Sequence, residues 1–339
     1  MQHKLTKGPL LNDQGELIES GYHTSLVKSY DRSQIKVKGM RIKEWDYYYL
    51  GNDSIGFALT VADNDYLWLT SITFFDFIEK KEHTYTKLGW FPRGKFKMPA
   101  TSAKGDIRLK SSKQTIEIIL EGKKRHLKVY VKDFKKGIDL NANLILEPTI
   151  KDSMVIATPF NQKGHFYYNQ KMNLLKSQGN LILGHHAFDF SDALGVLDWG
   201  RGVWTYQNTW YWSSLSGMED GHLIGFNLGY GFGDTSKATE NMVFYDQETF
   251  KLEDVIFNIP IKEGKESYLE PWTITSSNHD IKLTFTPILD RHSHSNIIFI
   301  SSLQHQVFGK FSGTIKVTHD RVIEIKNLMG FAEKVKNRW

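Results

Sequence analysis

The sequence predicts an all-β protein made of two tandem antiparallel β-domains, each a barrel or a sandwich. Two observations support this prediction. Short runs with period-2 alternation of apolar and polar residues recur along the 339-residue chain, whereas helical periodicity is scarce, and such alternation is typical of half-buried strands. In addition, a set of residues recurs at an offset of half the chain length, which indicates a duplicated unit.

The strand-forming runs are short, rich in β-branched residues and bounded by Gly, Asp, Asn or Lys. They include QTIEIILEG (114–122), HLKVYVKDF (126–134), DIKLTFTPIL (280–289), GTIKVTHD (313–320) and RVIEIKN (321–327). The segments EGKK (121–124) and EDGH (219–222) lie between such runs and are expected to form hairpin turns.

The repeat is clearest in residues 55–59 (IGFAL), which recur as residues 224–228 (IGFNL) at an offset of 169. The same offset matches three further pairs: Tyr30 with Trp199, Arg32 with Arg201, and Phe75 with Phe244. With a small shift, WDYYYL (45–50) parallels WYWSSL (210–215). We therefore expect an N-terminal barrel domain at 1–165 and a C-terminal barrel domain at 166–339.

Composition narrows the class of protein. Hydrophobic residues make up 40% and charged residues 24% of the chain, and no apolar run is long enough to span a membrane. The N-terminus carries no apolar leader, so a cytoplasmic protein is expected. The absence of cysteine excludes disulfides and thiolate chemistry. A net charge of +5 with scattered lysines predicts no nucleic-acid groove, and the sequence does not specify an oligomeric state.

Residues 197–217 (LDWGRGVWTYQNTWYWSSLSG) hold four of the nine tryptophans. If residues 203–213 form one extended strand, one face carries Trp204, Tyr206, Asn208, Trp210 and Trp212. In the next run, 224–234 (IGFNLGYGFGD), large apolar residues alternate with glycines, and Asn227 is the one hydrogen-bonding side chain on the glycine face. A glycine face has nothing to pack, so something large must approach it.

Two interpretations of these rings stay open. As core residues, each would bury roughly 150–250 Å², and the glycines would relieve crowding. Alternatively, the aromatic face lines a barrel cavity for a flat or long apolar ligand. In that case the ligand-binding residues would be Trp204, Trp210, Trp212 and Asn227.

Several segments together resemble the family catalogued as domain of unknown function 2804, from Pro9 to Trp339. They are LLNDQGELIESGYHTSLVKSYDR, TVADNDYLWLTSITFFD, residues 197–241, LTFTPILDR, HQVFGKFSGTI and GFAEKVKNRW. The chain is also similar, more distantly, to two-barrel lipocalin-like proteins of the hydroxyneurosporene synthase and tocopherol cyclase type. That resemblance implies two lipocalin-like barrels and an apolar isoprenoid or polyketide ligand inside or between them, while the first family brings no catalytic mechanism.

Three polar residues are candidates for chemistry. Asp198 and Arg201 lie three apart beside glycines, where a turn could pair them. The pair would be either a structural ion pair, repeated through Arg32, or an arginine held to bind a ligand carboxylate or phosphate. Glu240 follows the glycine-rich run, and in apolar surroundings its pKa would rise, so that it could protonate a double bond. Asp234 and Ser236 of the same segment are interpreted as residues that shape and cap a loop.

Metal and cofactor sites are not predicted. His185 and His186 are adjacent and would point to opposite faces of a strand, and His292 with His294 lacks a nearby carboxylate. We expect binding, and possible cofactor-free isomerisation, hydration or cyclisation, of a hydrophobic small molecule, with Glu240 and Asp198 as the catalytic residues and Arg201 as a further ligand contact. The alternative is a non-catalytic carbohydrate-binding or interaction scaffold protein.

Overall fold

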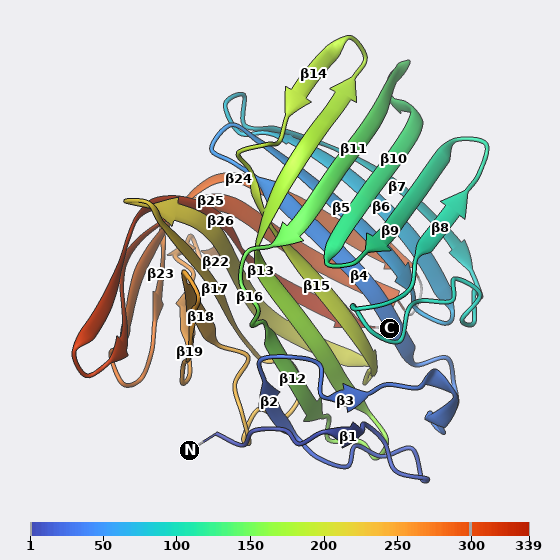
Figure 1. Ribbon diagram of the computed structural model, residues 1–339, viewed down its shortest axis with the longest axis vertical. Helices are drawn as coiled ribbons and strands as arrows, with labels where there is room; N and C mark the ends of the chain where they lie inside the picture. The colour runs from blue at the N-terminus through green and yellow to red at the C-terminus, as the bar shows by residue number, and fades with distance from the viewer. Residues whose placement is uncertain (1, 298–299, 339) are drawn as a thin grey trace.

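The computed structural model describes residues 2–297 and 300–338 and confirms the all-β prediction (Figure 1). Within these residues, every named element is a strand apart from one 3₁₀ turn, η1 (Arg32–Gln34). The strands form two large antiparallel sheets, each curled around its own apolar core, as expected for two tandem lipocalin-like barrels. No helix of the described part is long and apolar enough to cross a membrane.

The first sheet has 13 strands, and its main path runs β7-β6-β5-β4-β15-β13-β11-β10-β9-β8. Three more strands lie off this path: β12 and β14 pair with β13, and β2 pairs with β12. The bounds are β2 (Gly21–His23), β4 (Ile42–Gly51), β5 (Ile55–Asp63), β6 (Leu67–Asp76), β7 (Lys81–Trp90), β8 (Ile107–Lys110), β9 (Gln114–Glu121), β10 (Lys124–Lys135), β11 (Ile138–Pro148), β12 (Met154–Pro159), β13 (Phe166–Leu183), β14 (His186–Asp189) and β15 (Leu194–Val203).

The second sheet has nine strands in the order β19-β18-β17-β16-β26-β25-β24-β23-β20. Its bounds are β16 (Gln207–Glu219), β17 (His222–Tyr230), β18 (Met242–Tyr245), β19 (Glu248–Lys251), β20 (Ile256–Asn258), β23 (Trp272–Thr275), β24 (Ile281–Ile297), β25 (Ile300–Thr318) and β26 (Arg321–Arg338). Two further pairs are separate: β1 (Gly8–Pro9) with β3 (Lys28–Ser29), and β21 (Ile261–Lys262) with β22 (Lys265–Glu266).

The predicted repeat is confirmed in strands β4–β6 and β16–β18, which occupy equivalent places in the two sheets. Gly56 pairs with Phe75 across β5 and β6, and Gly225 pairs with Phe244 across β17 and β18. WDYYYL and WYWSSL also coincide, because the last leucine of each pairs with the phenylalanine of the following IGF motif. The order of the remaining strands continues the match, with β15 corresponding to β26 and β13 to β25.

Two of the matched pairs are not structural equivalents. Arg32 lies on η1 and Tyr30 just before it, whereas Trp199 and Arg201 lie on β15. All four belong to the first barrel, so the prediction of one such arginine in each barrel is wrong. The shared offset of 169 in these two pairs is a coincidence of sequence, because the paired residues do not occupy equivalent strands of the two sheets.

The chain passes from the first sheet to the second between Val203 and Gln207. The predicted boundary at 165/166 instead falls between β12 and β13, which pair with each other in the first sheet. The reason is that β13 and β15 close this sheet by joining β11 to β4. For the same reason residues 203–213 are not one strand, and Trp204 lies in the connection.

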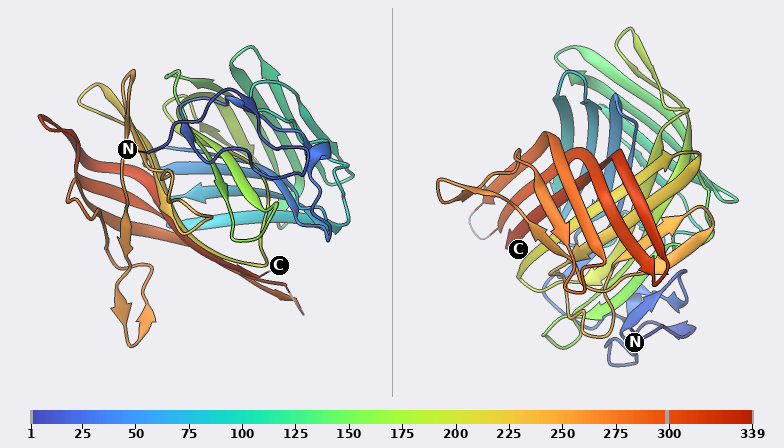
Figure 2. Two further views of the ribbon diagram at one scale, coloured as in Figure 1. Left: turned by 90° about the horizontal axis from the view of Figure 1, so that it is seen from below. Right: turned by 90° about the vertical axis from the view of Figure 1, so that its left-hand side faces the viewer.

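The two sheets pack against each other through their outer faces, and Figure 2 shows the strands of the second sheet crossing those of the first. Alternation along each strand divides its side chains between two cores. On β4, Tyr48 and Leu50 point into the first barrel, whereas Tyr47 and Tyr49 join a cluster that also contains Phe331 of the second sheet. We call this contact, which contains the buried side chains shared by β4, β13, β15, β16, β25 and β26, the inter-barrel face.

Candidate functional site

The inter-barrel face holds a buried charged unit on its first-sheet side. Lys171 Nζ of β13 lies 3.1 Å from Asp198 Oδ1 of β15, and the two side chains are 4% and 9% exposed. The Trp45 indole of β4 donates to Asp198 Oδ2 at 3.1 Å, and the Asn169 amide donates to Oδ1 at 2.5 Å. Asp198 is therefore a buried carboxylate held by three N–H donors from neighbouring strands.

A matching unit stands on the second-sheet side. The Trp210 indole of β16 donates to Glu333 Oε1 of β26 at 2.8 Å. The Gln306 amide of β25 donates to Glu333 Oε2 at 3.1 Å. Glu333 lies directly opposite Trp212 and Gln306 in the strand register.

The two units are equivalent under the internal repeat. Asp198 lies opposite Tyr47 and Lys171, as Glu333 lies opposite Trp212 and Gln306. In each unit the tryptophan two residues before that aromatic partner reaches the carboxyl, so Trp45 corresponds to Trp210 by position and by hydrogen bond. The duplication therefore brings two indole-bound carboxyls to one interface.

Contacts cross between the units. Tyr47 of the first sheet donates its hydroxyl to Gln306 Oε1 of the second at 3.3 Å. In return, Lys171 Nζ lies 3.7 Å from the ring centroid of Trp212, which is a cation–π contact. Arg291 of β24 also donates to Gln306 Oε1, at 3.1 Å. Tyr47 of the first sheet therefore contacts the Glu333 unit, and Trp212 of the second sheet contacts the Asp198 unit.

Two further residues predicted from the sequence border this site. Asn227 accepts from the Trp212 indole at 2.6 Å and donates to the backbone oxygen of Glu240 at 2.6 Å. The Glu240 carboxyl lies over the glycine face of β17, where a Cβ at Gly229 would be 2.8 Å from Oε1. At Gly225 the neighbour is instead the bulged strand β13, since Leu174 Cγ would lie 3.0 Å from such a Cβ.

Burial sets the proton affinity of these acids. It raises the pKa of Glu333 to about 7, because removal from water disfavours the charged form more than the Trp210 hydrogen bond favours it. Burial also raises the pKa of Glu240, opposed chiefly by the charge of Lys171. The pKa of Tyr167 is raised well above its usual value by burial and by the three nearby carboxyls. The site therefore contains an acid that can hold or release a proton near neutral pH.

Aromatic rings enclose the open end of the site. Trp204 makes edge-to-face contacts with Trp45 and Trp210, at centroid distances of 5.2 and 5.7 Å. Trp45 and Trp210 are partly exposed, while Trp204 and Trp212 are buried. A void of about 10 Å³, roughly the room for one water, lies elsewhere between the sheets, at Tyr49, Ser214 and Phe331, and none of the predicted ligand-binding residues lines it.

The glycines of the DWGRG segment make room for these rings. Gly200 and Gly202 share the face of β15 that carries Asp198. A Cβ at Gly200 would lie 1.9 Å from Trp45 Cζ2, and one at Gly202 would lie 3.4 Å from the Trp204 indole nitrogen. The Trp45 indole therefore occupies the space that a side chain at Gly200 would need, whereas the nearest atom at Gly202 is the backbone oxygen of Phe166, 2.5 Å from such a Cβ.

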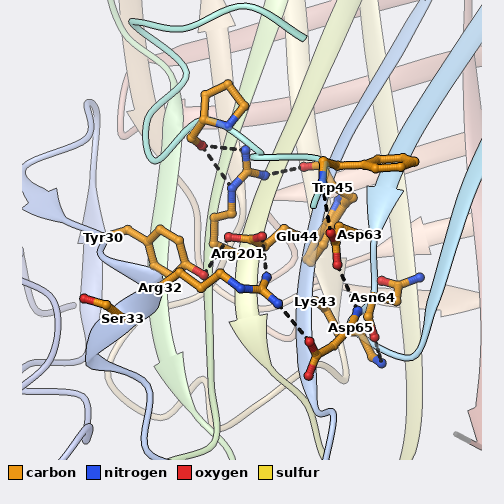
Figure 3. A network of polar contacts seen from close by, with 12 residues as sticks. Tyr30, Arg32, Ser33, Lys43, Glu44, Trp45, Asp63, Asn64, Asp65 and Arg201 are labelled. Carbon is orange, nitrogen blue, oxygen red and sulfur yellow. Dashed lines mark hydrogen bonds and ion pairs between the residues drawn. The ribbon is translucent and has the colours of Figure 1, made fainter. Parts of the chain in front are cut away.

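Arg201 points into the first barrel, away from the inter-barrel face (Figure 3). Its guanidinium donates to Asp46 at 3.0 Å and to the backbone oxygens of Trp45, Pro99 and Gly200 at 2.7 Å. With the bond from Nε to Pro99 O at 3.2 Å, all five N–H groups are used. Arg201 thus ties the loop at Pro99 to β4 and β15.

The predicted pairing of Asp198 with Arg201 is wrong. Both lie within β15, and residues three apart on a strand point to opposite faces. Asp198 pairs with Lys171, and Arg201 pairs with Asp46. Figure 3 shows the polar network on the Arg201 side, where Tyr30 and Arg32 bind Glu44.

The histidines are distributed over the surface. His185 and His186 lie at the β13–β14 turn, and His292 is exposed on β24, where its ring stacks on that of His305. Across residues 2–297 and 300–338, no group of three or more His, Asp or Glu side chains is placed to hold a metal ion.

Sequence reasoning missed Trp45, Lys171, Gln306 and Glu333. Trp45 had a signal in the WDYYYL repeat, which places it opposite Trp210. Glu333 and its partners had no such signal in the sequence. Asp198 of β15 and Glu333 of β26 are 135 positions apart, whereas the two IGF motifs are 169 apart, so a search at the offset of 169 does not match them. Loops of different length between equivalent strands hide this part of the repeat.

The comparisons with known proteins agree with this architecture. The family model described as domain of unknown function (DUF2804) matches residues 2–339. No curated protein matches the sequence. Among solved structures, an AttH-type protein of Nitrosomonas europaea matches with a TM-score of 0.56 at 12% identity, over 92% of this chain and 98% of that one. Kievitone hydratase from Nectria haematococca matches with a TM-score of 0.55 at 12% identity, over 92% and 96%. At this identity the likeness establishes the two-barrel fold alone.

Proposed function

The chain belongs to the DUF2804 family, and we propose that it binds a hydrophobic small molecule at the inter-barrel face and transfers protons to and from it. The reaction class is hydration, isomerisation or cyclisation without a cofactor. The observation that carries this proposal is the pair of buried carboxyls at the inter-barrel face, Asp198 and Glu333, each held by an indole and near enough for the charge of Asp198 to act on Glu333. The likeness in fold to a hydratase supports the same class.

The surroundings of the carboxyls suit such chemistry. An acid whose pKa lies near neutral pH can donate a proton and regain it, and Glu333 meets that condition. Glu240, whose pKa burial also raises, is a second proton donor in the proposal. Faces of Trp and Tyr rings stabilise cations, so an indole-lined site lowers the energy of a carbocation formed by protonation of a double bond. Asp198 supplies a negative charge beside it.

The ligand-binding walls in this proposal are Trp204, Trp210, Trp212 and Asn227. These rings pack against one another, so in this proposal a ligand makes its own room by turning rings aside or by parting the two sheets. Trp45 and Trp210 are the partly exposed indoles of the site, so they form its mouth. Arg201 has all five donors bound to protein groups, which leaves it a role in holding β15.

The test is turnover of a small-molecule extract. Purified protein is incubated with a lipid-soluble extract of the source cells, and the extract is compared by mass spectrometry before and after. A hydration appears as a gain of one water in mass, and an isomerisation or cyclisation as a new retention time at unchanged mass. Glu333→Gln removes the proton donor, whereas Glu324→Gln on the same strand changes a side chain that is 64% exposed and serves as the control.

We expect one compound to change with the unmodified protein and with Glu324→Gln, and not with Glu333→Gln. Conversion that persists in Glu333→Gln, or an extract left unchanged by the unmodified protein, would count against the proposal. Native mass spectrometry of the purified protein then identifies any bound apolar molecule directly.

A further inference from the structure

The two carboxyl units differ at one position. β13 places Lys171 beside Asp198, whereas the equivalent position of β25 places Gln306 beside Glu333. The indole hydrogen bond is the same in both units. Both carboxyls therefore accept the same indole hydrogen bond, but they differ in the charge of the neighbouring side chain. An ammonium group favours the charged form of a neighbouring acid, whereas an amide carries no net charge.

We infer that this exchange divides the proton transfer between the two halves: Asp198, beside Lys171, accepts the proton, and Glu333, beside Gln306, donates it. Lys171 and Gln306 act through the carboxyls and are positioning residues. The inference deepens the proposed function and rests on it for its catalytic meaning. The effect of the two neighbours, Lys171 and Gln306, on the protonation of Glu333 can be measured without any ligand.

Asp198 contacts three N–H donors, one of them a cation. Lys171 approaches Oδ1 at 3.1 Å, and the Asn169 amide donates to the same oxygen at 2.5 Å. Trp45 donates to the other oxygen at 3.1 Å. N–H donors thus occupy both oxygens, one of them a cation, and such a set stabilises the charged form.

The direct partners of Glu333 are uncharged, an indole at 2.8 Å and an amide at 3.1 Å. Burial raises its pKa to about 7, and the charge of Asp198 acts in the same direction. The Trp210 hydrogen bond and the charges of Lys171 and Arg291 oppose this rise. The titratable and polar groups that face it are Tyr47 of β4, Tyr167 and Lys171 of β13, Asp198 of β15, Trp210 of β16, Arg291 of β24 and Gln306 of β25.

The resulting step balances for a hydration. The O–H bond of Glu333 breaks as its proton forms a C–H bond at one carbon of the double bond. Water forms a C–O bond at the other carbon, and Asp198 takes the proton that the water loses. The substrate gains H₂O, Glu333 ends negative and Asp198 neutral, and one proton returning through water from Asp198 to Glu333 restores the site.

The test is the titration of Glu333 in protein labelled with ¹³C at the glutamate side-chain carboxyls, followed by NMR without ligand. The Glu333 signal is identified by its loss in Glu333→Gln. Gln306→Lys places a cation beside Glu333 and should lower its pKa by about 1 to 3 pH units. Lys171→Gln removes a cation and should raise it. Lys316→Gln removes an exposed charge from β25 and should leave it unchanged.

An unchanged Glu333 titration in Gln306→Lys, or a fall in Lys171→Gln, overturns the assignment. If circular dichroism shows that Gln306→Lys does not fold, Lys171→Gln decides the matter alone. Where the extract assay finds turnover, the alkaline limit of its pH profile should move with the Glu333 pKa in both variants. Shifted titrations without any turnover would reject the proposed function and leave the charge assignment standing.

Discussion

Gly200→Ala should strongly destabilise the protein through a single atom. The added Cβ would lie 1.9, 2.2 and 2.3 Å from three atoms of the Trp45 indole. Ring atoms cannot yield by rotating about an internal bond, so the whole indole must swing away from β15. It would then lose the 3.1 Å hydrogen bond to Asp198 and its edge contact with Trp204.

The magnitude follows from these two losses. Overpacking of a well-filled core costs about 1–3 kcal/mol. Loss of a hydrogen bond to a buried charged group costs about 1.5–3 kcal/mol. We therefore expect a fall of about 3–5 kcal/mol in the free energy of unfolding.

The assay is urea unfolding followed by far-ultraviolet circular dichroism. Trp45→Ala removes the atoms that clash, so Gly200→Ala made in that background should cost less than about 1 kcal/mol, and the double-mutant cycle should return a coupling of about 3 kcal/mol. Gly217→Ala is the matched control, because the nearest atom to its Cβ would be a terminal methyl of Leu328 at 3.1 Å, which can move aside.

Two results would refute this reasoning. One is a change below about 0.5 kcal/mol for Gly200→Ala alone, which is the size of an ordinary surface substitution. The other is an equal loss with and without the Trp45 indole, since the effect would then arise from the backbone of β15.

Three further predictions concern buried polar groups. Because the pKa of Glu333 is about 7 in the fold and 4.5 in the unfolded chain, its protonation stabilises the fold fully below pH 4.5, and this contribution is lost as the pH rises through about 7. Glu333→Gln does not titrate, so its free energy of unfolding in urea should rise by about 3 kcal/mol relative to that of the unmodified protein between pH 4.5 and 8. A difference that stays constant with pH would contradict this prediction. Arg201→Met leaves Asp46 buried without its cation and should cost about 3–5 kcal/mol, whereas an unchanged denaturation midpoint would mean that Arg201 does not hold β15. Asn227→Leu removes the hydrogen-bond partner of the Trp212 indole and of the Glu240 backbone carbonyl, so the free energy of unfolding in the same assay should fall by about 2–4 kcal/mol. A fall of less than about 1 kcal/mol would show that water takes over these two hydrogen bonds.

The fold could be predicted in some detail because it depends on local pattern. Alternation identified the strands, and the IGF motif identified their duplication. The motif is informative for a steric reason: a glycine opposite a phenylalanine on the next strand occurs in both sheets, as Gly56 with Phe75 and Gly225 with Phe244. The domain boundary could not be found this way, since β13 pairs with strands on both sides of the predicted join.

The candidate site was predicted in part. Trp210, Trp212, Asn227, Glu240 and Asp198 all lie at or beside the inter-barrel face, because they come from the β15–β18 region that the aromatic stretch marked. Their partners come from β4, β13, β25 and β26, which are distant in sequence. No periodicity reveals which face of a strand meets another barrel, as opposed to solvent.

By itself, the sequence determined the strand class, the duplication and the crowding of indoles against glycine, because each of these depends on neighbours one or two positions away or on a repeated pattern. The tertiary structure alone decided which charges meet. Strand order brought Lys171 to Asp198 and Gln306 to Glu333, and the packing of the two outer faces removed these groups from water. Proton affinity depends on burial and on the nearest charge, and both are properties of the assembled sheets.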